Sequence, residues 1–254
     1  MKYSNIMAND MNPFNIGIIG LSRSGKSVLM HSLGWGQSHS DYIKFYAKDM
    51  KTSLASRKTL ECLEGGRWPC VTSETEQLNY TMTYNDCPVI DFSVTDYIGS
   101  ILNSYDEIDQ KERTEFYKYL ENSAGLIFCV PSDTIIRILN GDDDAVEELE
   151  DLNDFIFKNG NIIKNIPVTI AITKSDLLEN ENENEKQAAC EIIKEELYAF
   201  CEGFQFFVSL VFVTLGEGLG DGEQGSKITT ENIYCRPMSD AFLLCFIQHY
   251  ESVN

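Results

Sequence analysis

Residues 20–27 read Gly20-Leu21-Ser22-Arg23-Ser24-Gly25-Lys26-Ser27 and fit the pattern G-x-x-x-x-G-K-S/T. The apolar run before them, residues 14–19, predicts a buried strand, and residues 26–35 after them predict a helix. In such a strand–loop–helix unit the backbone N–H groups of the loop and of the helix N-terminus point at bound phosphate. The sequence therefore predicts a phosphate-binding loop at the carboxyl end of a strand.

Three side chains of this loop have chemistry of their own. The ammonium of Lys26 would reach the β and γ oxygens of a nucleoside triphosphate, and the hydroxyl of Ser27 would bind Mg²⁺. The cation of Arg23 can fold over the same phosphates and stabilise negative charge in a transition state. We expect the loop to contact the phosphates through Gly20, Ser22, Arg23, Ser24, Gly25, Lys26, Ser27 and Val28.

A second motif is suited to selecting the base. Residues 167–172 predict another buried strand, which ends in Thr173-Lys174-Ser175-Asp176 and fits N/T-K-x-D. The carboxylate of Asp176 can accept hydrogen bonds from both N1–H and the 2-amino group of guanine. Adenine offers an acceptor at N1 and no 2-amino group, so it would leave this carboxylate unpaired. We expect Thr173 and Asp176 to select guanine, while the alkyl stem of Lys174 lies along the base and braces the phosphate loop.

Two further segments are candidates for sensing the γ-phosphate. Asp96-Tyr97-Ile98-Gly99 fits D-x-x-G at the end of a predicted strand, where Asp96 could bind Mg²⁺ through water and the Gly99 amide could contact the γ-phosphate. The other sensor should be a Thr in the loop ahead of the hairpin, called switch one below, and Thr72 and Thr75 are the candidates. Order in these loops would then depend on the γ-phosphate, which is the physical basis of a nucleotide switch.

Strand-like and helix-like segments alternate along the chain. Residues 77–84 and 88–95 alternate apolar and polar side chains around Asn85-Asp86-Cys87 and predict an antiparallel hairpin. Further strands are predicted at 125–130, 167–172 and 206–213, and helices at 48–64, 106–122, 142–158, 186–202 and 238–250. This order predicts an α/β protein with the three-layer P-loop GTPase fold. We expect a six-stranded, mostly parallel sheet with one antiparallel strand, from the hairpin of strands 2 and 3, and helices on both faces. An all-parallel Rossmann dehydrogenase would lack that hairpin.

The length of 254 residues fits one medium domain with insertions. We expect residues 13–254 to form a single P-loop GTPase domain, preceded by a flexible tail at 1–12. A helical insertion is predicted near 40–66, ahead of switch one.

The charge of the chain excludes some partners. It carries 40 Asp and Glu against 20 Lys and Arg, a formal net charge of -20, which repels nucleic-acid backbones and anionic lipids. The polar N-terminus predicts no signal peptide, and no apolar run of about 18 residues predicts an integral membrane segment. The 8 Cys include no C-x-x-C pair and are expected to be reduced thiols. The sequence therefore predicts a cytoplasmic protein with neither a nucleic-acid partner nor a membrane anchor.

With these residues placed, the chain resembles a TRAFAC-class GTPase, and the resemblance spans most of residues 14–250. Residues 60–72, which end in Trp68-Pro69-Cys70-Val71-Thr72, and the later Asp96-Tyr97-Ile98-Gly99 resemble the bacterial double-GTPase (DO-GTPase) group, which tends to carry W-P-x-x-T and D-Y-x-G. The resemblance makes Thr72 the switch-one threonine. It also places Ser100 where relatives often carry Glu and where Ras-like proteins carry a water-orienting Gln.

Two more expectations follow from resemblance. The phosphate loop is similar to that of guanylate-binding proteins and atlastins, in which the residue matching Arg23 acts as an internal arginine finger. The fifth family motif, normally S-A-x, is matched by Thr214-Leu215-Gly216 or, less well, by Ser209-Leu210-Val211. With the first match, the backbone N–H of Leu215 would meet the guanine O6. Since GTPases with an arginine in cis often complete their sites by pairing, a nucleotide-dependent homodimer is also predicted.

These observations favour a Mg²⁺-dependent switch that binds GTP and GDP, hydrolyses GTP slowly or with a partner's help, and acts on a protein effector. The candidate catalytic residues are Arg23, Lys26, Thr72 and Gly99, the candidate metal ligands are Ser27, Thr72 and Asp96, and the base is bound by Thr173, Lys174, Asp176, Thr214 and Leu215. An alternative is a nucleotide-stabilised interaction protein without turnover, whose acidic surface docks a basic partner. An ATP-dependent P-loop kinase is a third hypothesis, although no Arg-rich lid is visible in the sequence.

Overall fold

A seven-stranded sheet forms the centre of the molecule. The computed structural model describes residues 14–35, 42–69, 75–97, 110–179, 183–198, 203–206, 208–215 and 235–253. The strands are β1 (Phe14–Gly20), β2 (Ile43–Ala47), β3 (Glu76–Tyr84), β4 (Cys87–Asp96), β5 (Gly125–Pro131), β6 (Val168–Thr173) and β7 (Ser209–Phe212). They lie in the order β2-β3-β4-β1-β5-β6-β7, and within these described strands only β3 runs antiparallel to its neighbours.

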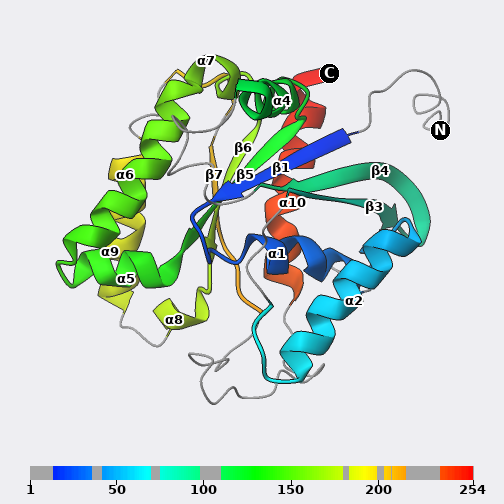
Figure 1. Ribbon diagram of the computed structural model, residues 1–254, viewed down its shortest axis with the longest axis horizontal. Helices are drawn as coiled ribbons and strands as arrows, with labels where there is room; N and C mark the ends of the chain where they lie inside the picture. The colour runs from blue at the N-terminus through cyan, green and yellow to red at the C-terminus, as the bar shows by residue number, and fades with distance from the viewer. Residues whose placement is uncertain are drawn as a thin grey trace.

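Helices cover both faces of this sheet (Figure 1). One face carries α1 (Lys26–Ser32), a 3₁₀ turn (Leu33–Trp35), α2 (Met50–Glu64) and α10 (Cys235–Val253). The other face carries α4 (Gln110–Glu121), α5 (Ser132–Leu139), α6 (Asp143–Lys158), α7 (Gly160–Ile163), α8 (Asp176–Glu179) and α9 (Glu183–Ile193), which continues as a π-helical turn (Lys194–Tyr198). Each layer of helices buries its own apolar cluster against the sheet.

The central strand β1 shows why the sequence around the phosphate loop is so apolar. Ile16 and Ile18 point into the cluster under α1 and α10, whereas Ile19 points into the cluster under α4 and α6. A strand buried on both faces reads as a continuous apolar run because neither face meets water. β1 is also the middle strand of the sheet. The phosphate loop, which begins where β1 ends at Gly20, therefore lies at the middle of the edge formed by the carboxyl ends of the parallel strands.

The predicted fold class is confirmed, with a correction to the number of strands. The three layers, the mostly parallel sheet and the single antiparallel strand are those of the P-loop GTPase fold, and the hairpin predicted at 77–84 and 88–95 is β3 and β4. Asn85 and Asp86 join these strands with φ values of 50° and 59°, as a type I′ turn requires. The sheet has seven strands instead of the predicted six, because β2 adds a strand beside β3.

β2 and α5 are the longest elements that sequence patterns missed, and the four-residue helices α7 and α8 were not predicted either. β2 is five residues long, and only Phe45 is fully buried, so its apolar pattern is too short to stand out. α5 follows β5 directly, and its eight residues continue the apolar character of the strand. The described β7 is shorter than the predicted 206–213, and the tail predicted at 1–12 lies outside the described residues.

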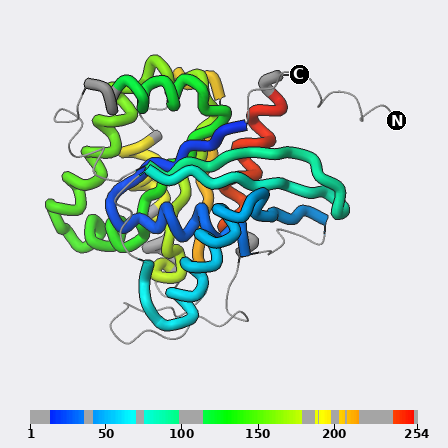
Figure 2. The backbone as a smooth tube through the Cα atoms, turned by 45° about the vertical axis from the view of Figure 1, so that its right-hand side comes forward, coloured from blue at the N-terminus to red at the C-terminus, as the bar shows by residue number. Residues whose placement is uncertain are grey.

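In the range near 40–66, where a helical insertion was predicted, the described residues form the strand β2 as well as α2, and α2 packs through a polar inner face. Its buried residues, spaced as one face of a helix, are Thr52, Ser56, Thr59 and Leu63. The hydroxyl of Thr52 accepts from the backbone N–H of Asn79 on β3, at 2.9 Å, and the Asn79 amide donates to Asp49 at 2.8 Å. Figure 2 shows α2 alongside the β3–β4 hairpin. Hydrogen bonds to β3 therefore attach this helix to the sheet in addition to the apolar packing of Leu63.

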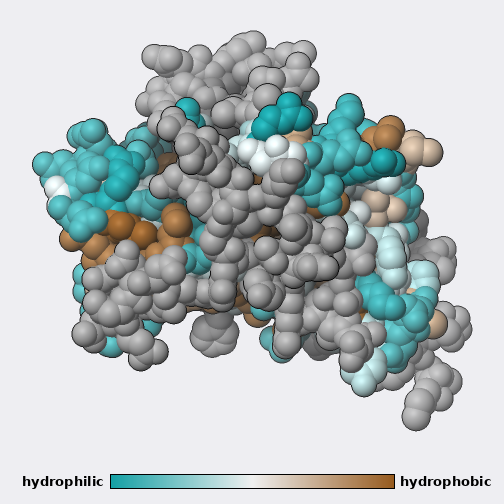
Figure 3. All heavy atoms as spheres, turned by 90° about the horizontal axis from the view of Figure 1, so that it is seen from below, coloured by the Kyte–Doolittle hydropathy of each residue, from teal (hydrophilic) through white to brown (hydrophobic). Residues whose placement is uncertain are grey.

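The outer surface of the described residues is mixed in character. From below (Figure 3), apolar side chains gather on the left, on the side of α5 and α6, with hydrophilic side chains directly above them in this view. Met50 and Phe157 are the most exposed large apolar residues described, at 74% and 71%. Among the described helices we find none with both the length and the apolar character that crossing a membrane requires.

Replacing Gly20 by Ala should destabilise the fold. A Cβ at this position would lie 2.4 Å from the carbonyl oxygen of Cys129, so β1 and β5 would have to move apart. We expect the free energy of unfolding in urea to fall by about 1–3 kcal/mol. Gly160→Ala is the matched control, since a Cβ there meets nothing within 4 Å, and its unfolding should stay within about 0.5 kcal/mol of the wild type. Equal losses in the two variants would contradict this view of the strand contact.

Candidate functional site

The loop between β1 and α1 has the backbone shape expected of an anion-binding loop. Arg23 and Gly25 have left-handed φ values of 61° and 82°, and the Ser24 N–H donates to the Leu21 carbonyl at 3.3 Å. Alternating backbone handedness of this kind turns successive N–H groups toward one point. Glycine adopts the left-handed shape readily, whereas Arg23 adopts it at an energetic cost. Arg23 and Ser22 are exposed at the tip of the loop.

Lys26 lies inside this loop. Its ammonium donates to the carbonyl oxygens of Gly20, at 2.9 Å, and Leu21, at 2.6 Å, and contacts the Ser24 hydroxyl at 3.4 Å. Burial lowers the pKa of Lys26, and the Asp96 carboxylate acts in the opposite direction. The lysine therefore fixes the curvature of the loop and presents a positive charge where the sequence predicts phosphate.

Ser27 and Asp96, predicted as metal ligands, lie in contact. The Ser27 hydroxyl donates to Oδ2 of Asp96 at 2.5 Å, across 69 residues of sequence. Asp96 is 0% exposed, and among the described residues its Oδ1 has no hydrogen-bond partner. A hydroxyl and a buried carboxylate with an unused oxygen are hard oxygen donors of the kind that Mg²⁺ prefers. These two residues fit the predicted metal, while no cluster of three or more His, Cys, Asp or Glu in the described part of the chain could hold one.

Burial makes the charged form of the Asp96 carboxyl unfavourable. Burial raises its pKa, while the hydrogen bond from Ser27 and the charge of Lys26 lower it by less. Tyr97 fixes the backbone beside this carboxylate: its N–H donates to the Ile18 carbonyl, and its buried ring packs against Phe116 of α4 with ring centroids 4.7 Å apart. The backbone beside the Asp96 carboxylate is therefore anchored to β1 and to α4.

Thr173 ties the predicted base motif to the phosphate loop. Its hydroxyl donates to the Ser24 carbonyl at 2.6 Å, across 149 residues of sequence. Its own carbonyl accepts a hydrogen bond from the Ser132 hydroxyl, 2.8 Å away and buried. The loops that follow β1, β5 and β6 are thus connected through one residue.

The structure brings Thr214 to Asp176. The Thr214 hydroxyl donates to Oδ1 of Asp176 at 2.7 Å, and Leu215, the next residue, is buried at 7% exposure. Ser209, the alternative start of the fifth motif, lies within β7 and accepts from Gln248 of α10. Of the two matches, the one that begins at Thr214 is therefore beside the base motif, through Thr214 itself.

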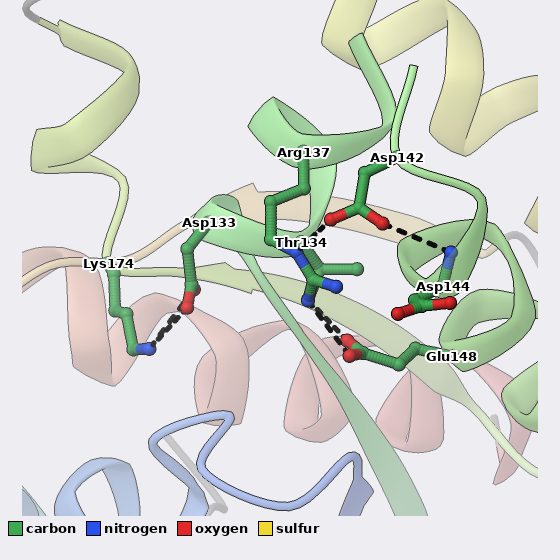
Figure 4. A network of polar contacts seen from close by, with 7 residues as sticks. All are labelled: Asp133, Thr134, Arg137, Asp142, Asp144, Glu148 and Lys174. Atoms are coloured by element: carbon green, nitrogen blue, oxygen red, sulfur yellow. Dashed lines mark hydrogen bonds and ion pairs between the residues drawn. The ribbon is translucent and has the colours of Figure 1, made fainter. Parts of the chain in front are cut away.

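Lys174 has a partner that sequence patterns did not indicate. Its ammonium lies 3.0 and 3.1 Å from the two carboxylate oxygens of Asp133, at the start of α5 (Figure 4). Farther along α5, Arg137 bridges Asp142, at 2.7 Å, and Glu148, at 2.9 Å. The expected bracing of the phosphate loop is made by Thr173, while the described contacts of the Lys174 ammonium are with Asp133.

His31 is a second residue that the sequence did not single out for the site. It is buried on α1, one turn after Ser27, with Nδ1 against the Thr59 hydroxyl of α2 and Nε2 3.0 Å from Glu76 at the start of β3. The hydrogen bond with His31 lowers the pKa of Glu76. Since Glu76 pairs with Asp96 in the β3–β4 register, His31 joins α1 and α2 to the strand beside Asp96.

Several predicted residues lie outside the described part of the chain. Thr72, Gly99 and Ser100 are among them, so their predicted roles stay predictions. Thr75, the other switch-one candidate, is described and exposed.

Comparisons with known proteins find similarity to solved structures only. No family model matches the chain, and no curated protein does. One similar structure is an ADP-ribosylation factor-like GTP-binding protein, the small COPII coat GTPase SAR1 from Encephalitozoon cuniculi in complex with GDP. It has 14% identity and a TM-score of 0.45, and the match covers 96% of this chain and 83% of that one.

A second similar structure is a bacterial selenocysteine-specific elongation factor, EF-Sec. It has 15% identity and a TM-score of 0.43, covering 96% of this chain but 30% of the elongation factor. At such identities the likeness concerns the fold alone, and the site rests on this chain's own residues.

Asp96→Asn should stabilise the nucleotide-free protein. An acid whose pKa is raised by burial is less costly to bury when neutral, so its ionised form lowers stability above its ordinary pKa of 3.8. Asparagine removes the charge and keeps an oxygen for Ser27. We expect the free energy of unfolding at pH 7 to rise by on the order of 1 kcal/mol, measured by urea titration.

The gain should shrink as the pH falls toward 3.8 and be lost below it, where the wild-type carboxyl becomes neutral in both folded and unfolded chains. Asp154→Asn, at an exposed carboxylate on α6, is the control and should show no gain. A loss of stability in Asp96→Asn at pH 7 would contradict the assignment of a strained charge.

Proposed function

We propose that the protein is a Mg²⁺-dependent guanine-nucleotide switch that hydrolyses GTP slowly, or when a partner stimulates it, and acts on a protein effector. The observation that carries the proposal is the convergence of two separate motifs on one edge of the sheet. Lys26, Ser27 and Asp96 gather at one end of that edge, and Thr173 links them to Asp176 and Thr214 at the other.

Guanine recognition is supported by the surroundings of Asp176. The hydrogen bond from Thr214 occupies one carboxylate oxygen and orients the other. A carboxylate fixed in this way can accept from N1–H and the 2-amino group of guanine, and an adenine would leave it unpaired. The N–H of Leu215 follows directly and is proposed to donate to the guanine O6. These donors and acceptors match guanine and not adenine, which argues against the hypothesis of an ATP-dependent kinase.

The phosphates and the metal fit the other end. The backbone N–H groups of residues 22–28 and the ammonium of Lys26 would bind the phosphate oxygens, while Ser27 and Asp96 would hold Mg²⁺. When bound, Mg²⁺ neutralises charge that develops on the phosphate oxygens. Binding would also relieve the buried Asp96 carboxylate, whose Oδ1 lacks a described partner. Thr72 and Gly99 are proposed to contact the γ-phosphate from the two switch loops.

Arg23 is the residue proposed to supply catalytic charge. It stands exposed at the tip of the loop with a left-handed backbone, from which its side chain can fold over bound phosphates. Ser100 favours the alternative, an interaction protein that binds nucleotide without turnover, because serine is a poor substitute for a residue that orients water. Pairing of two copies on GTP binding stays a prediction.

Nucleotide selectivity tests the proposal first. In titrations of fluorescent GTP, ATP and xanthosine triphosphate analogues with Mg²⁺, we expect tight binding of the GTP analogue alone. Asp176→Asn should weaken GTP on the order of 100-fold and improve xanthosine triphosphate, whose 2-carbonyl can accept from the new amide. The contact with Thr214 survives the substitution, because asparagine keeps an accepting oxygen. Equal binding of GTP and ATP would contradict the proposal.

Turnover separates the switch from the scaffold. We expect slow multiple-turnover phosphate release by the wild type and a fall of about 10³-fold or more in Arg23→Ala, with GTP affinity nearly unchanged. Arg57→Ala is the matched control, since Arg57 is also exposed and pairs with Glu61 on α2, away from the loop. No phosphate release from the wild type at any protein concentration would favour the scaffold.

A further inference from the structure

Asp133 stands beside the base motif without belonging to any of the motifs. Its two carboxylate oxygens lie 3.0 and 3.1 Å from the ammonium of Lys174, so the contact is bidentate (Figure 4). Both side chains are part-exposed, 35% for Lys174 and 48% for Asp133. The ion pair joins the start of α5 to the loop after β6, a connection made on the solvent side of the Thr173 contacts.

The backbone places both residues before the ion pair forms. Pro131 and Thr173 are partners in the parallel register of β5 and β6, and the next residue, Ser132, donates to the Thr173 carbonyl at 2.8 Å. Lys174 has a left-handed φ of 54°, which a non-glycine residue keeps only when its surroundings hold it. The direction in which the Lys174 side chain leaves the backbone is therefore set by its neighbours.

A lysine fixed at its backbone still has a flexible side chain. A lysine side chain loses rotamer entropy when it is held in one conformation. Asp133 fixes the far end of this stem, so part of that entropy is lost before any ligand arrives. A ligand that packs on a prearranged surface binds more tightly because it does not have to order that surface.

We propose that Asp133 is a positioning residue, which holds the alkyl stem of Lys174 extended as an apolar wall for the nucleotide base. The inference rests on the proposed function, because it assigns this wall to the guanine site. Asp133 acts through Lys174. Its loss should therefore affect ligands that have a base and spare a phosphate ligand that has none.

The test measures dissociation of a fluorescent GDP analogue, in the presence of Mg²⁺, from the full chain by stopped flow. We expect Asp133→Asn to speed dissociation about two- to fivefold, the size of a part-exposed ion pair. Asp133→Glu should restore much of the wild-type rate. Asp142→Asn is the matched control, because Asp142 makes a comparable ion pair with Arg137 at the other end of α5, and its rate should equal that of the wild type.

Two further measurements distinguish positioning from general loosening. Competition by inorganic tripolyphosphate, which has no base, should be equal in wild type and Asp133→Asn. In a Lys174→Met background, which keeps a long stem without the ammonium, Asp133→Asn should add no further effect. An unchanged rate in Asp133→Asn, weaker tripolyphosphate binding, or an additive effect on Lys174→Met would each overturn the inference.

The wild-type titration separates this result from the proposed function. If the wild type binds GDP and the Asp133 variants behave like it, the inference alone fails. If the wild type shows no preference for guanine nucleotides, the proposed function fails and the inference fails with it.

Discussion

The hydrogen bond from the Thr173 hydroxyl to the Ser24 carbonyl joins the two halves of the candidate site. Parallel strands deliver their carboxyl ends to one edge of a sheet, but the loops beyond them have no ladder to hold them together. Here one residue supplies that link twice, since the Thr173 carbonyl also accepts from Ser132. In a nucleotide, covalent bonds fix the distance between the phosphates and the base. In the proposed site, the hydrogen bond from Thr173 to Ser24 would fix the matching distance between the phosphate loop and the base motif.

The same edge carries charge that the protein alone does not fully compensate. Lys26 and Asp96 are both buried, and burial shifts the pKa of each toward its neutral form. A ligand that brings both negative phosphate and a cation would satisfy the two groups together. Binding and folding stability are then linked, because any ligand that binds only the folded protein stabilises it.

Sequence patterns predicted the parts of the fold that are long or strongly constrained. The loop at 20–27, the hairpin and the strands on either side of β1 have either a fixed spacing or a long apolar pattern. β2 was missed because five residues with one buried side chain carry little signal. Its place depends on backbone pairing with β3, which no local pattern encodes.

For the candidate site, sequence patterns identified the residues inside the motifs. They did not identify the residues outside the motifs that contact them. Asp133 contacts the motif residue Lys174 across 41 residues of sequence, and His31 contacts Glu76, the register partner of Asp96, across 45, so spacing could not reveal these contacts. The sequence already preferred Thr214 to Ser209 for the fifth motif, but it could not show what either hydroxyl contacts. In the structure Thr214 donates to Asp176, whereas Ser209 lies within β7 and accepts from Gln248.

The polar inner face of α2 has a consequence for how this helix opens locally. When α2 separates from the sheet, Thr52 and Thr59 lose hydrogen bonds that water can replace. Separation of an apolar helix would instead expose apolar surface to water. The single apolar residue that α2 buries fully is Leu63, whereas α10 buries Met238, Ala241, Phe242, Cys245 and Phe246 in the same cluster. Of these two helices, α2 is therefore the one whose local opening the hydrophobic effect opposes less.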